Sequence, residues 1–155
     1  NRRVKEAMKE ALLSIIKDEN RIITGPIDPQ YLSDNLGRKK GTAEAVVFPV
    51  STEEISGVMR YAWKNNLPVT PRGAGTNLVG STVPSGHGIV LDVSLMNHVL
   101  ELDEETFTAT VEPGVVLEDF QAYVESKGLF YPPDPGEKKP PSAAISAPMQ
   151  AVCVL

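Results

Sequence analysis

The chain has 155 residues, of which 41% are hydrophobic and 23% charged, and its formal net charge is -5. This balance is typical of a globular domain with one ordinary core, and the negative charge argues against non-specific nucleic-acid binding. No apolar run approaches the roughly 20 residues that cross a bilayer, and a single cysteine, Cys153, excludes an internal disulfide framework. We therefore expect a reducing, cytoplasmic location and no transmembrane segment.

The N-terminal region predicts a helix followed by a long loop. Apolar residues recur at helical spacing over residues 3–18, which indicates an amphipathic helix with one packed face. Residues 25–43 are rich in Gly, Pro, Asp and Asn and predict a loop, with one helical turn near Tyr31. The apolar stripe of the helix consists of Val4, Ala7, Met8, Ala11, Leu12, Ile15 and Ile16.

The next segment predicts a β-α-β unit. The apolar run 45–48 indicates a buried strand, and Ser51 with Glu54 three residues later forms a capping box that starts a helix. Residues 67–70 indicate a second strand, which we expect to pair in parallel with the first through a right-handed crossover. The predicted buried face of the helix comprises Ile55, Val58, Met59, Ala62 and Trp63.

The remainder of the chain predicts further strands and a second helix. Three strands are expected, at residues 88–93, 99–102 and 106–111. The last two form a hairpin whose acidic turn is residues 103–105. Residues 116–127 predict a helix that ends at Gly128, and a short final strand follows at 129–131. This order of elements favours an α/β or α+β layered architecture.

The most informative segment is the glycine-rich stretch 71–81, which follows the second strand of the β-α-β unit. Glycine adopts φ angles that other residues avoid, so several backbone N–H groups can converge on one anion. Thr76 and Ser81 can add hydroxyl donors, and Arg72 either adds positive charge or is a solvated side chain. Gly80 comes too late for a G-x-G-x-x-G fingerprint, and the Gly-Lys-Ser/Thr of a Walker A loop is absent. A plain turn remains the alternative.

The same stretch resembles the P-R-G-x-G-T-x-L loop of the FAD-linked oxidase family, of the glycolate oxidase/D-lactate dehydrogenase type. The likeness extends over most of residues 31–137 through further motifs in the same order. Several ordered matches together are far more specific than one glycine-rich turn. They are residues 31–34 against Y-S-x-D, 46–55 against V-x-x-P-x-S-x-E-E-I, 111–115 against V-x-P-G-V and 131–135 against Y-P-P-D-P.

The resemblance implies an α+β FAD-binding domain of the PCMH type, vanillyl-alcohol-oxidase-like, with two small α/β subdomains and incomplete at its C-terminal side. The glycine-rich stretch would bind the pyrophosphate, and residues 132–134 would lie near the flavin. Asn77 stands where some relatives of the wider fold carry a flavin-linking histidine, so we expect non-covalent FAD. The expected cofactor-binding residues are Pro71, Arg72, Gly73, Ala74, Gly75, Thr76, Asn77, Leu78, Gly80, Ser81, Pro132, Pro133 and Asp134.

The resemblance also implies a flavin-dependent oxidoreductase that oxidises a small 2-hydroxy acid, glycolate or D-lactate, by hydride transfer to FAD. In the family, substrate residues come mostly from a C-terminal domain, so we assign no catalytic residue and expect this fragment alone to be inactive. Two alternatives stay open: the FAD domain of another PCMH-type enzyme, and a truncated product without activity. His87 and His98 have no partner at metal-ligand spacing, so we expect no metal site.

The C-terminal stretch departs from the family pattern. After Glu137 the family continues with a Thr-Ala-x-Ile-Gly-Gly-Asn-like motif, and residues 140–155 are compatible with that motif when their codons are read in a shifted frame. Lys138 and Lys139 indicate a run of adenines, where slippage would shift the frame. A Pro/Ala-rich disordered end is the alternative. We therefore expect a helical segment at 1–40, a partial FAD-binding domain at 41–137 and a frameshifted tail at 138–155.

Overall fold

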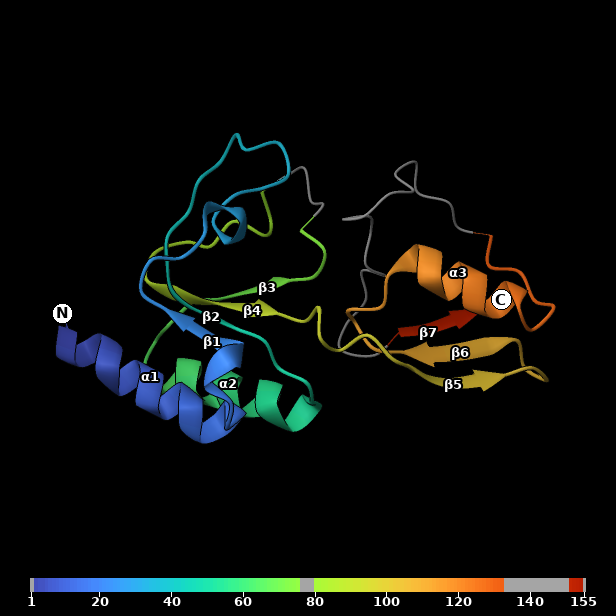
Figure 1. Cartoon of the computed structure of the whole chain (residues 1–155), viewed down its shortest axis with the longest axis horizontal. Coiled ribbons are helices and arrows are strands. Elements are labelled where there is room, and N and C mark those ends of the chain that lie inside the picture. The colour runs from blue at the N-terminus through green and yellow to red at the C-terminus, as the bar shows by residue number, and fades with distance from the viewer. Residues whose placement is uncertain (1, 76–79, 133–150, 155) are drawn as a thin grey trace.

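The computed structural model describes residues 2–75, 80–132 and 151–154, which form two lobes along the longest axis of the molecule (Figure 1). The first lobe contains α1 (Arg2–Ile16), η1 (Glu19–Arg21), β1 (Ile22–Thr24), η2 (Pro29–Tyr31), β2 (Ala43–Val47), α2 (Thr52–Lys64), β3 (Val69–Arg72) and β4 (Gly88–Asp92). The second contains β5 (Val99–Asp103), β6 (Thr108–Val111), α3 (Leu117–Glu125) and β7 (Ala151–Val154). None of the helices described is long and apolar enough to cross a membrane.

The first lobe is a four-stranded sheet in the order β1-β2-β4-β3. β4 pairs in parallel with both β2 and β3, and β1 pairs antiparallel with β2. The expected direct pairing of the two strands that flank α2 is therefore wrong, because β4 lies between them. All five residues of β4 are buried, which suits a central position, whereas Pro71 lacks an N–H and so suits the edge strand β3.

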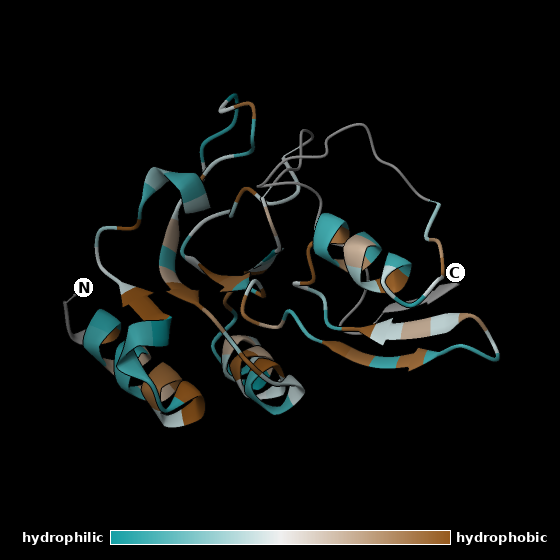
Figure 2. Ribbon diagram, turned by 45° about the vertical axis from the view of Figure 1, so that its right-hand side comes forward, coloured by the Kyte–Doolittle hydropathy of each residue, from teal (hydrophilic) through white to brown (hydrophobic). Residues whose placement is uncertain are grey.

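Two amphipathic helices pack in the core of this lobe (Figure 2). α1 buries Met8, Leu12 and Ile16 at intervals of four residues. This stripe is narrower than predicted, since Val4 in the first turn is 66% exposed and that end of the helix projects beyond the sheet (Figure 1). The short strand β1 follows α1 in the same core through Ile22; its three residues were too few to be recognised in the sequence.

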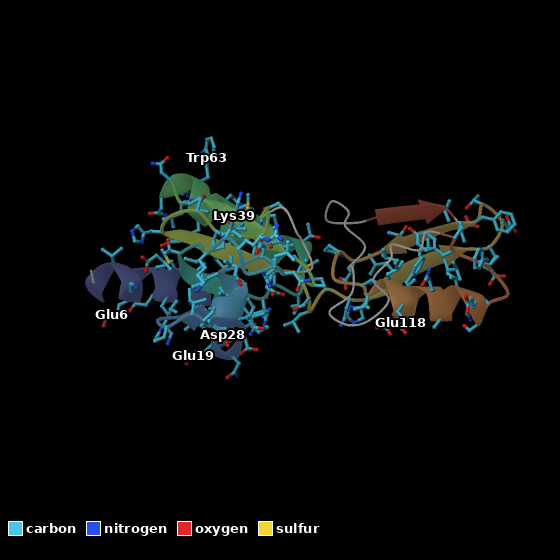
Figure 3. All side chains as sticks on the ribbon, turned by 90° about the horizontal axis from the view of Figure 1, so that it is seen from above. Glu6, Glu19, Asp28, Lys39, Trp63 and Glu118 are labelled. Carbon is cyan, nitrogen blue, oxygen red and sulfur yellow. The ribbon has the colours of Figure 1, made fainter. Side chains whose placement is uncertain are left out.

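α2 begins as the sequence predicts but buries a narrower face. The Ser51 hydroxyl accepts a hydrogen bond from the Glu54 N–H at 3.2 Å, which confirms the helix cap. The buried residues are Ile55, Val58 and Ala62. The prediction that Met59 and Trp63 share this face is wrong: they are 46% and 85% exposed, and Trp63 lies on the outside of the lobe (Figure 3). Each follows a buried residue by one position, which turns it about 100° away around the helix.

The second lobe packs α3 on a sheet of order β5-β6-β7. The predicted hairpin is confirmed as the antiparallel pair β5–β6, and β7 pairs antiparallel with β6. Phe120 and Val124 of α3 fill the core with Ala109 and Val111 of β6. The final strand expected at residues 129–131 is wrong. That segment has no strand pairing within the described chain, because it turns back along α3 instead.

That turn is made by the C-terminal end of α3. Gly128, with φ +76°, adopts the left-handed conformation expected of the residue after a helix. The Leu129 N–H then donates to the Val124 carbonyl at 3.0 Å. This path brings the Tyr131 ring edge-on to Phe120, with centroids 5.1 Å apart. Residues 151–154 of the predicted tail form β7, and the domain boundaries at 40 and 137 stay predictions.

Candidate cofactor site

The candidate site lies at the carboxyl edge of the first lobe's parallel strands. Because β2, β4 and β3 run in one direction, their C-terminal ends meet at the same edge. Phe48 follows β2, Val93 follows β4, and the glycine-rich loop follows β3. Open sheets of this kind bind ligands in the crevice at this edge. The fold thus places the glycine-rich loop where a nucleotide is expected.

The described site residues lie in three places, and five further predicted positions lie outside the described residues. Pro71 and Arg72 are the last two residues of β3, so the loop begins at Gly73. Gly80 and Ser81 continue the same connection between β3 and β4, and Pro132 is exposed next to Tyr131 in the second lobe. No hydrogen bond among the described residues joins Pro132 to the loop. Outside the described residues lie the predicted positions Thr76, Asn77, Leu78, Pro133 and Asp134.

The described part of the loop fits a diphosphate. Gly75 and Gly80 have φ angles of +73° and +81°, in the left-handed region that glycine adopts without strain. The main-chain N–H groups of residues 73–75 donate no hydrogen bond to another described group. The Thr82 hydroxyl is buried without a partner in the described chain. Uncharged donors on a glycine-rich turn are suited to an anion.

Arg72 is engaged by the protein rather than solvated. Its Nη1 donates to the Ser33 carbonyl at 3.3 Å, and its Cζ lies 5.8 Å from the centroid of the Tyr31 ring. Tyr31 in turn meets Phe48 edge-on, with ring centroids 5.9 Å apart. Burial raises the pKa of the Tyr31 phenol, and the carboxylates of Asp92 and Asp28 raise it further while Arg72 opposes them.

Asp92 is a buried carboxylate at the same edge. It is 5% exposed and stands opposite Arg72 in the register of β3 and β4. Burial raises the pKa of the Asp92 carboxyl, whereas hydrogen bonds from Ser94 and the charge of Arg72 act to lower it. Neither Asp92 nor Tyr31 is among the site residues predicted from the sequence. The signals available were an acidic residue ending a wholly apolar strand, and a tyrosine in the first family motif.

Other polar groups lie away from this edge. The His87 and His98 rings are largely exposed and hydrogen-bond to Glu44 and Glu112 at 2.6 and 2.7 Å. Within the described ranges, no three His, Cys, Asp or Glu residues are grouped so that they could hold a metal.

An open cavity of about 360 Å³ lies in the second lobe. Its lining includes Asn97, His98, Val116, Asp119, Phe120 and Tyr123.

The fold and this site define an α+β nucleotide-binding domain, with a glycine-rich turn at the carboxyl edge of a parallel sheet. The FAD binding domain family matches residues 43–152. The chain therefore belongs to this FAD-binding family, and FAD is its cofactor.

Two curated relatives resemble most of the chain. It is 42% identical over 132 residues to "Glycolate oxidase subunit GlcD" of Bacillus subtilis (strain 168), covering 85% of this chain and 28% of that protein. It is 43% identical over 120 residues to "D-lactate dehydrogenase" of Anaerostipes hadrus, covering 76% of this chain and 25% of that protein. The chain thus spans about a quarter of the length of these relatives.

Solved structures show the same fold. P-cresol methylhydroxylase with substrate bound superposes with a TM-score of 0.68 at 20% identity, over 80% of this chain and 25% of that chain. An alkyldihydroxyacetonephosphate synthase superposes with a TM-score of 0.66 at 23% identity, over 75% and 24%. These likenesses confirm the expected PCMH-type architecture with two small subdomains.

Proposed function

We propose that this chain is the FAD-binding part of a flavin-dependent oxidoreductase that oxidises a small 2-hydroxy acid. Two relatives at 42% and 43% identity are named for glycolate and D-lactate, and a third from Bos taurus, 34% identical over 120 residues, is named for D-2-hydroxyglutarate. All three acids carry a hydroxyl on the carbon beside the carboxylate. Shared chemistry among the named substrates supports the class of substrate, not one member of it.

The observation that carries the proposal is the turn at residues 73–75. Its three N–H groups are left without a described acceptor at the carboxyl edge of β3. An anion bound there would accept hydrogen bonds from these N–H groups, in place of the water that hydrates it in solution. We assign to them the pyrophosphate of FAD, held non-covalently. The remaining predicted positions at 76–78, 80–81 and 132–134 belong to the same proposal.

FAD, when bound, would supply an acceptor for the hydride that leaves the α-carbon of the acid. The hydroxyl proton would leave to a base or to water, so that the acid becomes a 2-oxo acid. The residues of this chain hold and orient the cofactor. We assign no catalytic acid or base to them, and we expect the chain by itself to show no turnover. A cytoplasmic location is part of the proposal and is tested by cell fractionation.

Ligand competition tests the site. We expect the purified chain to quench FAD fluorescence on titration, with a complex too weak to survive gel filtration, because the chain spans only about a quarter of the length of its relatives. ADP should compete with FAD and riboflavin should not, since only ADP carries the diphosphate. Equal competition by riboflavin, or no binding of either nucleotide, would contradict the assignment.

Anaerobic mixing tests the substrate class. Glycolate, D-lactate and D-2-hydroxyglutarate are each added to a protein that carries this domain at the length of its relatives, loaded with FAD. We expect one or more of them to bleach the visible absorbance of oxidised flavin. L-lactate is the matched control and should leave this absorbance unchanged. Bleaching by none of the acids would exclude the proposed substrate class.

The reading frame of the C-terminal stretch has its own test. We propose that residues from about Lys139 onward are translated in a shifted frame. Determining the DNA sequence that encodes this stretch and the bases after it decides the matter. A run of adenines at Lys138 and Lys139, followed by the family motif in another frame, is expected. The family motif further along in the present frame would refute the shift.

A further inference from the structure

We propose that Arg72 is a positioning residue, which with Tyr31 supports the turn at residues 73–75 from behind, rather than a ligand of the phosphate. This inference rests on the proposed function, because it concerns the same loop. The sequence left two roles open for Arg72, a charge for the site or a solvated side chain. The contacts below support neither role and point instead to a third, support of the loop.

Two contacts within the described part of the chain hold Arg72. Its guanidinium donates to the Ser33 carbonyl at 3.3 Å and lies over the Tyr31 ring at 5.8 Å. Asp92, its register partner on β4, is a buried carboxyl whose pKa the charge of Arg72 acts to lower. A guanidinium that lies over an aromatic face and donates to a carbonyl is stabilised where it is. Binding phosphate directly would require it to give up these partners.

Gly75 shows what the guanidinium does in this position. A Cβ at Gly75 would lie 2.2 Å from Nη2 and 2.6 Å from Cζ of Arg72. The side chain of Arg72 therefore fills the space on one side of the turn, against the α-carbon of Gly75. With that side filled, the turn has less room to change its conformation. We infer that this support keeps the N–H groups of residues 73–75, which have no described acceptor, directed away from the protein.

Tyr31 is itself held by the chain around it. It ends η2, whose cap is formed by the Asp28 carboxylate accepting from the Gln30 N–H at 2.9 Å. Its ring meets Phe48, at the end of β2, edge-on. Tyr31 therefore links three segments that are distant in the sequence: η2, the residue that follows β2 and, through Arg72, the end of β3. Stacking of this kind is specific to arginine, since a lysine ammonium has no planar face.

The first experiment measures the loop in the chain without ligand. Amide ¹⁵N relaxation of residues 73–75 is compared in the wild type, Arg72→Met, Arg72→Lys, Tyr31→Leu and Tyr31→Phe. We expect order parameters of about 0.8 in the wild type and Tyr31→Phe, and a fall below about 0.6 in the other three. Tyr31→Phe should keep the turn ordered because it retains the aromatic ring over which Arg72 lies. Unchanged order parameters in Arg72→Met and Tyr31→Leu would overturn the proposal.

Lys39 offers a matched control for charge. Its stem lies beside Gly80, where a Cβ would be 2.8 Å from the Lys39 Cδ, and it is exposed (labelled in Figure 3). Lys39→Met removes one positive charge beside the same loop without touching Gly75. We expect it to leave the order parameters of residues 73–75 unchanged. A fall equal to that of Arg72→Met would show that lost charge, not lost support, loosens the turn.

The second experiment measures affinity for FAD and ADP in the same variants. If Arg72 supports the turn, Arg72→Lys and Tyr31→Leu weaken both ligands as Arg72→Met does, by roughly 3- to 30-fold. The double variant Tyr31→Leu/Arg72→Met then weakens them no further, because both changes remove one support. If Arg72 instead binds phosphate, Arg72→Lys keeps most of the affinity and Tyr31→Leu has little effect. A wild type that binds neither ligand refutes the proposed function, and the relaxation experiment still decides the role of Arg72.

Discussion

Single glycines at the candidate site differ in what surrounds them. Gly75 and Gly86 both have positive φ angles, +73° and +68°. A Cβ at Gly86 would meet nothing within 4 Å, whereas one at Gly75 would overlap the Arg72 guanidinium. The backbone conformation therefore favours glycine at both positions, and only at Gly75 would an added side chain also have to displace a neighbour. Comparing the two separates conformational strain from steric overlap.

We expect Gly86→Ala to lower the free energy of unfolding by about 1–2 kcal/mol, the cost of a side chain in the left-handed region. Gly75→Ala carries the same strain and also moves the Arg72 guanidinium to another rotamer, which adds about 0.5–1.5 kcal/mol. It should also weaken ADP binding, which Gly86→Ala leaves unchanged. Urea unfolding and ADP titration of the two variants check this. If the two variants lost the same free energy of unfolding and bound ADP equally well, Arg72 would move aside freely.

At the scale of elements, Arg21 joins three segments of the first lobe. Its Nη2 donates to the Ile16 carbonyl at 2.6 Å, at the end of α1, and its Nη1 to the Phe48 carbonyl at 3.1 Å, after β2. Both nitrogens also bind the Glu54 carboxylate, at 2.6 and 2.9 Å, in the first turn of α2. Glu54 in turn accepts from the Val50 N–H at 2.8 Å. One partly buried ion pair thus orients two helices against the sheet.

Burial raises the pKa of the Glu54 carboxyl, but the hydrogen bonds and charge of Arg21 and the Val50 N–H outweigh it, so the pKa lies below its usual value. The stabilisation is therefore present above the unfolded pKa, about 4.3, and is lost as the pH falls through the lower folded pKa. We expect Glu54→Gln to cost about 2 kcal/mol at pH 7.

Urea unfolding at neutral and acid pH measures this cost, which should shrink below about pH 4, where wild-type Glu54 is increasingly protonated. Glu53→Gln is the control, because Glu53 is exposed in the same helical turn and forms no described ion pair. It should stay within about 0.5 kcal/mol of the wild type. A difference between wild type and Glu54→Gln that does not vary with pH would contradict the ionic role.

At the scale of the whole molecule, the two lobes are in contact at the turn that contains Gly114. The Gly114 N–H donates to the Met96 carbonyl at 2.7 Å. A Cβ at Gly114 would lie 2.2 Å from the Val93 carbonyl oxygen and 2.7 Å from that of Met96. Met96 belongs to the first core, and Val115, next to Gly114, belongs to the second. The lobes can approach this closely only because no side chain stands between the two backbones.

We expect Gly114→Ala to cost about 1–3 kcal/mol or more, since backbone atoms cannot turn aside as a side chain does. For a chain of this size that corresponds to a fall in Tm of roughly 2–4 °C per kcal/mol. Calorimetry compares it with Gly128→Ala, where a Cβ would meet nothing within 4 Å but φ is +76°, so that variant carries only the left-handed strain of about 1–2 kcal/mol. A cost of Gly114→Ala below about 0.5 kcal/mol would show that the lobes separate without cost.

The sequence by itself determined the local elements and the family. Ser51 and Glu54 marked the start of α2, the apolar run ending at Asp92 marked β4, and Asp103 marked the hairpin turn, where its carboxylate accepts from the N–H groups of Glu105 and Thr106. Each signal acts between residues close along the chain. The ordered motifs identified an FAD-binding domain, and the glycine-rich stretch located its loop.

Only the tertiary structure decided how these elements combine. It inserted β4 between β2 and β3, turned Trp63 outward, and brought Tyr31 beneath Arg72 across 41 positions of the chain. Such contacts depend on which apolar runs can be covered on both faces, and on the angle at which each helix then packs. The spacing of apolar residues along the chain carries no information on strand order or on helix packing angle. The positions of Tyr31 and Asp92 beside the loop therefore became evident only from the assembled sheet.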